Sequence, residues 1–257
     1  DLEERVVRAL HILSDQVYVQ RQADGTYAYM TNEEKEVRRE ISQIIVESRE
    51  VTDLLRADIR KHVGTSATSF VYPGTNRRMG VSLFVDGRRE QAEPLVISVF
   101  TPQSSLDEDG IRHESVVRRD TLSLGLDISS EILEDVRVFC QTEEYVKRQA
   151  GASSGLRKRI ILTYKEDNDQ RRRVIGEAVK DALMRASLFV DGQEVKTGTA
   201  DEPKAVIELG LTRLAQQVYP RIEDAKPLAG LKDGQIASFL RDQEDATLDV
   251  DPGVDIA

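Results

Sequence analysis

Hydrophobic residues recur at helical spacing at the start of the chain and then alternate with polar residues over two short stretches. The helical stripe consists of Leu2, Val6, Val7, Leu10 and Leu13. Residues 17–21 and 26–30 are rich in β-forming side chains and flank an Asp24-Gly25 turn signal, which predicts a β-hairpin. A helix followed by a hairpin is how a winged-helix domain ends, so we interpret residues 1–31 as a partial winged helix, consisting of the last helix and the wing. We expect the first two helices of that domain to lie before Asp1, in a longer protein.

The next periodic segment predicts one long connecting helix over residues 32–63. Thr31 and Asn32 are suitable N-caps, and glutamates in the first turn place negative charge where the helix dipole favours it. An apolar stripe follows, made of Val37, Ile41, Ile44 or Ile45, Val51 and Leu55. About thirty residues at about 1.5 Å each span about 45 Å. Such a helix connects two modules more naturally than it fills one.

Residues 64–222 predict an α+β domain in which a small mixed or antiparallel sheet packs with long helices. Four short runs rich in Val, Ile, Leu and Phe, bounded by turn signals, predict strands at residues 69–72, 79–85, 95–100 and 121–128. Helical spacing predicts helices that begin near Ser130 and at Pro203, and a further hairpin lies around Asp191-Gly192.

Residues 153–186 allow two interpretations. Residues 160–164 alone resemble a strand, whereas the apolar residues from Val174 to Ala186 have clear helical spacing. We favour one long helix from about Leu156, and a strand at residues 160–164 remains the alternative.

One six-residue segment occurs twice. Ser-Leu-Phe-Val-Asp-Gly stands at residues 82–87 and again at residues 187–192. The flanking sequences differ, whereas a duplicated module predicts similarity there too. We therefore interpret the two copies as independent strand-plus-turn segments.

Charge and cysteine content limit the environment of the chain. The formal net charge is −10, which argues against a nucleic-acid binder that is basic overall. Residues 223–257 predict a linker, a short helix over 233–241 and an acidic tail, so a local basic face elsewhere is compatible with the acidic total. Cys140 is the only cysteine, which excludes an internal disulfide and favours a reducing, cytoplasmic location. No apolar run approaches the roughly 18 residues that a membrane helix needs.

The sequence offers no complete motif for catalysis, cofactor binding or metal binding. Three residues separate Gly151 from Gly155 and no Gly-Lys-Ser/Thr follows, so this loop fails the pattern that wraps nucleotide phosphates. Neither Cys-x-x-Cys nor His-x-x-x-His occurs. Cys140 lies on an apolar helical stripe, which favours a buried core thiol. The acidic residues 107–109 with Glu114 have the chemistry of a cation site, but we favour a solvated loop. We therefore expect no catalytic residue, cofactor or metal in this segment.

The predicted winged helix supplies the first group of candidate nucleic-acid contacts. Arg5, Arg8 and Arg21 lie near Tyr18 and Tyr27 in the sequence of this element, and recognition helices and wings often contact DNA. Many winged helices instead mediate protein contacts, and acidic residues share the helix with Arg5 and Arg8. Both roles stay open for this element.

The second group is a run of three basic residues, Arg171, Arg172 and Arg173. Consecutive arginines suit phosphate contacts, and they are equally typical of a solvated helix face.

The order of these elements resembles a known family. The wing sequence Asp24-Gly-Thr-Tyr27 and the helix start Thr31-Asn-Glu-Glu-Lys35-Glu-Val-Arg-Arg-Glu-Ile41 are similar to the BREX phage-defence P-loop proteins of the BrxC/PglY family. Similar stretches follow at residues 96–102, 122–128, 136–139, 144–148, 181–186 and 188–194. The resemblance covers most of residues 16–222 and depends on the order of the motifs, because no single motif is specific.

The resemblance implies a place for the chain within a larger protein. Members of this family are large AAA+-like ATPases whose nucleotide site lies N-terminal to this region, in bacterial complexes that distinguish unmodified phage DNA from methylated host DNA. The chain would be a middle fragment beyond the ATPase core, with ATP and Mg²⁺ bound by the parent protein. Other BREX subunits, DNA and further copies of the parent protein are the partners that the resemblance implies.

These observations favour a non-catalytic assembly and DNA-engagement segment of a BREX ATPase. The alternative is a winged-helix DNA-binding regulator with a C-terminal α+β domain that senses a ligand. The residues encoded before Asp1 distinguish the two, because only the ATPase has a Gly-x-x-x-x-Gly-Lys-Ser/Thr motif there.

Overall fold

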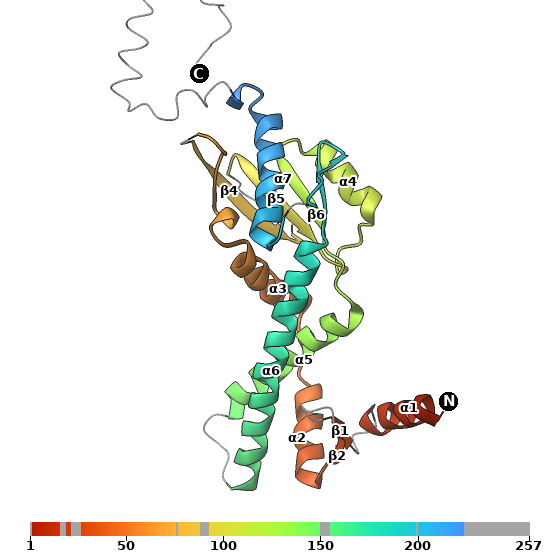
Figure 1. The fold of residues 1–257 in the computed structure, drawn as a ribbon. Helices are drawn as coiled ribbons and strands as arrows, with labels where there is room; N and C mark the ends of the chain where they lie inside the picture. The colour runs from red at the N-terminus through yellow and green to blue at the C-terminus, as the bar shows by residue number, and fades with distance from the viewer. Residues whose placement is uncertain are drawn as a thin grey trace, which may run out of the picture.

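Figure 1 shows the computed structural model of the chain, which describes residues 2–15, 19–21, 27–75, 77–87, 93–149, 155–198 and 200–223. A six-stranded sheet with its packed helices forms one end of the molecule. Two helices lead from the sheet to the opposite end, where a short helix and a two-stranded sheet lie beside them. The predicted α+β class is thereby confirmed. The predicted short helix over residues 233–241 and the acidic tail lie outside the described residues.

The N-terminal elements follow the predicted order of a helix and a hairpin. Helix α1 (Leu2–Asp15) precedes strands β1 (Val19–Arg21) and β2 (Tyr27–Tyr29), which pair antiparallel. The Asp24-Gly25 turn lies outside the described residues. Arg38 of the next helix donates a hydrogen bond to the Val19 carbonyl at 3.4 Å, which attaches the hairpin to that helix. That these elements belong to a winged helix stays a prediction.

The prediction of a single helix over residues 32–63 is wrong, because the structure has two helices there. Helix α2 (Asn32–Ser42) begins with a capping box in which Thr31 and Glu34 satisfy each other's backbone amides. Helix α3 (Ser48–Val63) begins with a second capping box, formed by Glu47 and Glu50. A new N-terminal cap starts a new helix, and the apolar stripe conceals the break because it continues on both sides.

A glutamine from another helix stabilises the break between α2 and α3. The last carbonyls of α2 have no partner within the helix, as at every helix C-terminus. The Gln141 side-chain amide donates to the carbonyl of Ser42, the last residue of α2, at 3.4 Å and to the carbonyl of Ile44 in the connection at 2.8 Å. The chain can therefore change direction at residues 43–47 with these two carbonyls hydrogen-bonded.

The main sheet is mixed, with strand order β3-β4-β5-β6-β7-β8. Its strands are β3 (Ser69–Val71), β4 (Arg78–Val85), β5 (Leu95–Phe100), β6 (Thr121–Gly125), β7 (Ser187–Val190) and β8 (Gln193–Glu194). Strands β4, β5 and β6 run parallel, and the β3–β4, β6–β7 and β7–β8 pairs are antiparallel. The two copies of Ser-Leu-Phe-Val-Asp-Gly form β4 and β7, which run in opposite directions. In each copy the aspartate before the final glycine has a positive φ, Asp86 at 45° and Asp191 at 48°, a conformation that turn aspartates tolerate.

Helices cover both faces of the sheet. A short 3-10 helix, η1 (Gly64–Ala67), follows α3. Helix α7 (Pro203–Val218) packs on the face of the sheet that presents Leu122 and Leu188. Helix α4 (Glu108–Val117) packs on the other face, where Arg112 lies 4.9 Å from the centre of the Phe189 ring. The interpretation of the acidic residues 107–109 as a solvated loop is therefore wrong. Asp107 caps α4 by accepting from the Gly110 amide at 2.9 Å, so these acidic residues mark a helix N-terminus.

Helices α5 (Ser130–Gln149) and α6 (Leu156–Met184) form what we call the helical arm. Helix α5 leads away from the sheet and α6 returns to it, although β6 and β7 on either side of this insertion are neighbours in the sheet. The 29 residues of α6 form one continuous helix, so the favoured interpretation of residues 160–164 is confirmed. Within the described residues, no helix is both long enough and apolar enough to cross a membrane.

The arm connects two separate clusters of buried apolar side chains. The larger cluster combines the sheet with α3, α7 and the C-terminal half of α6, including Ile175, Val179 and Leu183. The smaller cluster lies at the far end of the arm and consists of Val37, Ile41, Ile44, Tyr145, Ile160 and Ile161. Helix α6 is thus part of both cores.

Two helical glycines predict opposite responses to the same substitution. A Cβ at Gly176 in α6 would meet open space, so Gly176→Ala is expected to stabilise the fold by about 0.5–1 kcal/mol through helix propensity. A Cβ at Gly210 in α7 would lie 2.6 Å from a methyl group of the fully buried Leu122, so Gly210→Ala is expected to destabilise by about 1–3 kcal/mol. Chemical denaturation of both variants measures the two effects, and equal signs would contradict this packing.

Candidate nucleic-acid interface

The predicted arginines of the N-terminal element lie at the surface where they are described. Arg5 and Arg8 are exposed on α1, three residues apart and therefore on the same side of the helix. Arg21 lies on β1, but its side chain is outside the described part of the structure. Arg5 and Arg8 are thus available to a ligand.

The Arg171–Arg173 triplet is divided between internal and external positions. Arg172 forms a bidentate ion pair with Asp58 of α3, and its guanidinium lies 5.6 Å from the centre of the Phe139 ring on α5. Asp58 is only 2% exposed, so its charge depends on this partner. Arg173 is exposed. Arg172 therefore has a structural role at the point where α3, α5 and α6 meet.

Further polar contacts fix α6 at this junction. Arg171 pairs with Asp135 of α5 at 3.3 Å and donates to the side-chain oxygen of Asn168 at 3.1 Å. The Asn168 side chain is fully buried and donates to the Phe139 carbonyl at 3.2 Å. On α3, the His62 ring nitrogen Nε2 lies 3.0 Å from the carbonyl oxygen of Gly176. Arg171 and Arg172, two of the three arginines in the triplet, therefore hold helices together.

A second polar group fixes the far end of the arm. The Glu40 carboxylate of α2 accepts a hydrogen bond from the Tyr145 hydroxyl at 2.7 Å and pairs with Arg157, which also donates to the Tyr145 oxygen at 3.0 Å. Hydrogen bonding from Arg157, and then from Tyr145, lowers the pKa of Glu40. Burial and the bond to Glu40 raise the pKa of Tyr145. The carboxylate therefore stays ionised and holds α2, α5 and α6 together.

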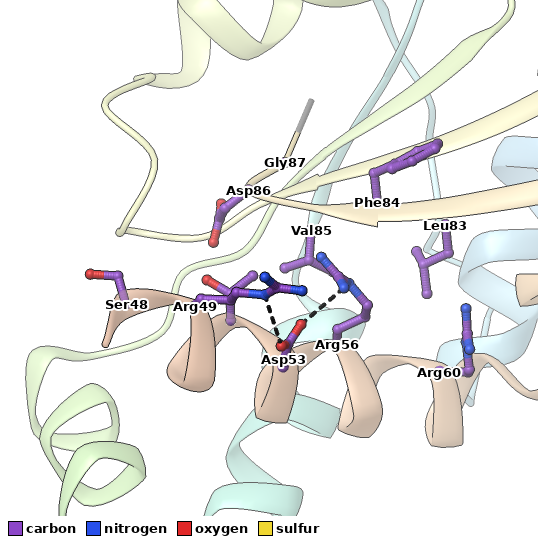
Figure 2. A pocket seen from close by; sticks show the side chains of 11 residues that line it. Ser48, Arg49, Asp53, Arg56, Arg60, Leu83, Phe84, Val85, Asp86 and Gly87 are labelled. Carbon is purple, nitrogen blue, oxygen red and sulfur yellow. Dashed lines mark hydrogen bonds and ion pairs between the residues drawn. The ribbon is translucent and has the colours of Figure 1, made fainter. Parts of the chain in front are cut away.

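A groove of about 780 Å³ lies between α3 and the end of β4. Figure 2 shows Arg49, Arg56 and Arg60 on the side of α3 that faces the strand. Asp53 lies between the first two and pairs with Arg49 at 3.7 Å and with Arg56 at 3.0 Å. Residues 83–87 form the opposite wall.

Sequence reasoning missed this group of arginines, although the signal was present. Arg49, Arg56 and Arg60 are not neighbours in the sequence but are spaced at i, i+7 and i+11. At about 100° per residue, these positions lie within about 20° of one line along a helix. Basic residues at helical spacing are therefore the sequence signal for this group.

Groups with altered acidity show little that suits catalysis. Burial raises the pKa of the Cys140 thiol, which keeps it protonated and weakly nucleophilic. Cys140 is half-buried rather than fully buried as predicted. Burial also raises the pKa of Tyr164 to about 12. Within the described ranges, no group of three or more His, Cys, Asp or Glu side chains is arranged to hold a metal ion.

Comparison with known proteins identifies one family. Residues 32–214, which are more than half of the chain, match the family model described as the BREX ATP-binding protein BrxC 4th domain with six-stranded beta sheet. The match begins at the first residue of α2 and includes all six strands of the main sheet. No solved structure matches the chain.

The buried ion pair predicts a large loss of stability when one partner is removed. Asp58→Ala leaves the Arg172 guanidinium without its carboxylate at the helix junction and is expected to lower the unfolding free energy by about 2–4 kcal/mol. This loss is somewhat smaller than for a fully buried ion pair, because the Arg172 side chain is one third exposed. Asp53→Ala removes an exposed carboxylate of the same helix and is expected to change stability by at most about 0.5 kcal/mol. Urea denaturation compares the two variants, and similar losses would contradict the role assigned to Asp58.

The lowered pKa of Glu40 predicts a pH-dependent contribution to stability. Because the folded-state pKa lies below the unfolded value of about 4.3, the contribution is present above that value and is lost as pH falls through the folded-state pKa. Glu40→Gln is expected to lower the unfolding free energy by up to about 1 kcal/mol at pH 7, since both partners are about one third exposed. The difference from the native chain should shrink towards zero below about pH 4. A difference independent of pH would show that Glu40 acts through packing alone.

Proposed function

The chain belongs to the family of the BREX ATP-binding protein BrxC, and from this premise we propose that it is a non-catalytic assembly and DNA-engagement segment of a BREX anti-phage defence ATPase. Membership of this family connects the chain with BREX phage defence and supports this function over that of a ligand-sensing regulator. ATP and Mg²⁺ would be bound elsewhere in the parent protein, because the chain contains no Gly-x-x-x-x-Gly-Lys-Ser/Thr sequence.

The observation that carries the assembly role is the continuity of α6 through both apolar clusters. A helix of 29 residues spans about 43 Å at about 1.5 Å per residue. Ile160 and Ile161 are buried in the far cluster, and Val179 and Leu183 are buried in the sheet cluster. One continuous helix therefore packs into both clusters and would hold α2 at a fixed distance from the sheet.

The absence of a catalytic role is supported by the chemistry of the described side chains. The Cys140 thiol has a raised pKa, and the arginines at the helix junctions are paired with carboxylates. Other BREX subunits and further copies of the parent protein would be the partners of a segment with a fixed shape.

The DNA-engagement role is supported by the exposed arginines on α1 and along the α3 groove. With a net charge of −10, binding to a polyanion requires the basic residues to be concentrated locally. Helix α1, which carries Arg5 and Arg8, lies at the end of the molecule far from the sheet, whereas the groove lies between α3 and β4. Two separated basic sites suit a long ligand.

Interrupting α6 between its two clusters tests the assembly role. Glu166 is exposed and lies between Ile161 and Asn168, so Glu166→Pro removes a backbone donor and introduces a ring clash without deleting a core side chain. The variant is expected to lose most of its co-purification with the other BREX subunits, whereas Glu166→Ala retains it. Circular dichroism checks that the sheet domain stays folded. A folded proline variant that assembles like the native chain would overturn the role of α6 as a rigid connection.

A further inference from the structure

We propose that the groove between α3 and β4 binds the phosphodiester backbone of DNA through Arg49, Arg56 and Arg60. This inference rests on the proposed function and assigns its DNA-contacting surface. Neither the predicted winged helix nor the arginine triplet includes any of these residues.

The spacing of the three arginines fits a ligand with repeated negative charges. Along the helix, Arg56 follows Arg49 by about 10.5 Å and Arg60 follows Arg56 by about 6 Å. The whole line covers about 16 Å, and one DNA strand advances about 3.4 Å along the duplex axis per phosphate. The three guanidinium groups therefore face a stretch of about five phosphates.

The guanidinium groups remain available for a ligand. The pairs that Asp53 forms with Arg49 and Arg56 are largely exposed, and exposed pairs contribute little and exchange readily with other anions. Within the described residues, Arg60 is exposed and has no ion pair, and the Arg56 side chain is 37% exposed. A phosphate oxygen would supply a charged acceptor to the accessible guanidinium nitrogens.

The carboxylates near the groove do not cancel this charge. Asp53 lies between Arg49 and Arg56, so Asp53 and the three arginines of α3 together have an excess of positive charge. Asp86 of the opposite wall accepts hydrogen bonds from the Thr101 amide at 2.7 Å and from the Thr101 hydroxyl, so its oxygens bind the end of β5. Asp86 keeps its negative charge, and the lining of three arginines and two aspartates still has an excess of one positive charge.

The shape of the groove favours an extended ligand over a small molecule. The Arg49 side chain is 86% exposed, whereas a small-molecule site encloses most of its ligand. A duplex that lies along the surface needs no enclosure and gains from each additional phosphate contact.

Salt dependence of DNA binding tests the inference directly. The probe is a fluorescein-labelled 20-base-pair duplex, and the measurement is fluorescence anisotropy at salt concentrations between 50 and 200 mM. If three phosphate contacts are made, the triple variant Arg49→Gln, Arg56→Gln, Arg60→Gln is expected to reduce the slope of log K against log salt by about 2.7. Over a fourfold change in salt, this slope corresponds to a factor of about 40 in affinity.

A matched control separates the site from total charge. The triple variant Arg118→Gln, Arg137→Gln, Arg148→Gln removes the same charge from exposed arginines that also pair within their own helices on α4 and α5. It is expected to leave the slope nearly unchanged. Asp53→Asn removes the competing carboxylate and is expected to tighten binding roughly twofold to fivefold. Equal slopes for the native chain and the α3 triple variant would overturn the inference.

The remaining outcomes distinguish this inference from the proposed function. If the α3 variant binds DNA normally but Arg5→Gln with Arg8→Gln does not, DNA engagement stands and the groove is the wrong site. If the native chain binds no DNA yet co-purifies with BREX subunits, the assembly role stands and this inference fails. If the α3 variant loses subunit association but keeps DNA binding, the groove is a protein-docking surface, which also overturns the inference.

Discussion

The ion pair between Asp58 and Arg172 determines how the two ends of the molecule are joined. Asp58 is almost fully buried on α3, and its charge is compensated by a guanidinium that comes from α6 and lies against Phe139 of α5. Three helices must therefore meet at one position. Because α6 is continuous, the same contact also fixes the direction in which the far cluster and α2 lie. On α3, Asp58 lies about 180° around the helix from Arg49. Packing of Asp58 at the junction therefore leaves Arg49, Arg56 and Arg60 on the side of α3 that faces away from α6.

Elements whose signals are local could be predicted from the sequence. The apolar spacing of α6 was sufficient to predict that helix, and the turn signal at Asp191-Gly192 was sufficient to predict the hairpin, because both signals depend on neighbouring residues. Strand direction was not accessible, since β4 and β5 pair in parallel and β7 joins β6 from a distant part of the sequence. The break between α2 and α3 was missed because the apolar stripe continues across it and because Gln141, which binds two carbonyls at the break, lies on α5. Such contacts between distant segments leave no periodic pattern.

The arginines show why candidate site residues are harder to predict than elements. Arg172 and Arg49 have the same side chain, but one compensates a buried carboxylate and the other is exposed. The difference depends on which helix face meets another helix, and that is settled by tertiary packing. Arg171 and Arg172 were conspicuous because they are adjacent in sequence, yet helical geometry points adjacent residues in different directions. The acidic residues of α4 gave a similar ambiguity, because carboxylates serve both as helix caps and as cation ligands.

The position of the helical arm in the topology makes its length independent of the sheet. Strands β6 and β7 are hydrogen-bonded neighbours, and the whole of α5 and α6 is inserted between them. Adding seven residues to each helix, about two turns, would lengthen the arm by about 10 Å and return each side chain to nearly the same orientation. No strand would have to change its register. Related proteins can therefore differ in the reach of this arm, in steps of whole turns, while they retain the same six-stranded sheet.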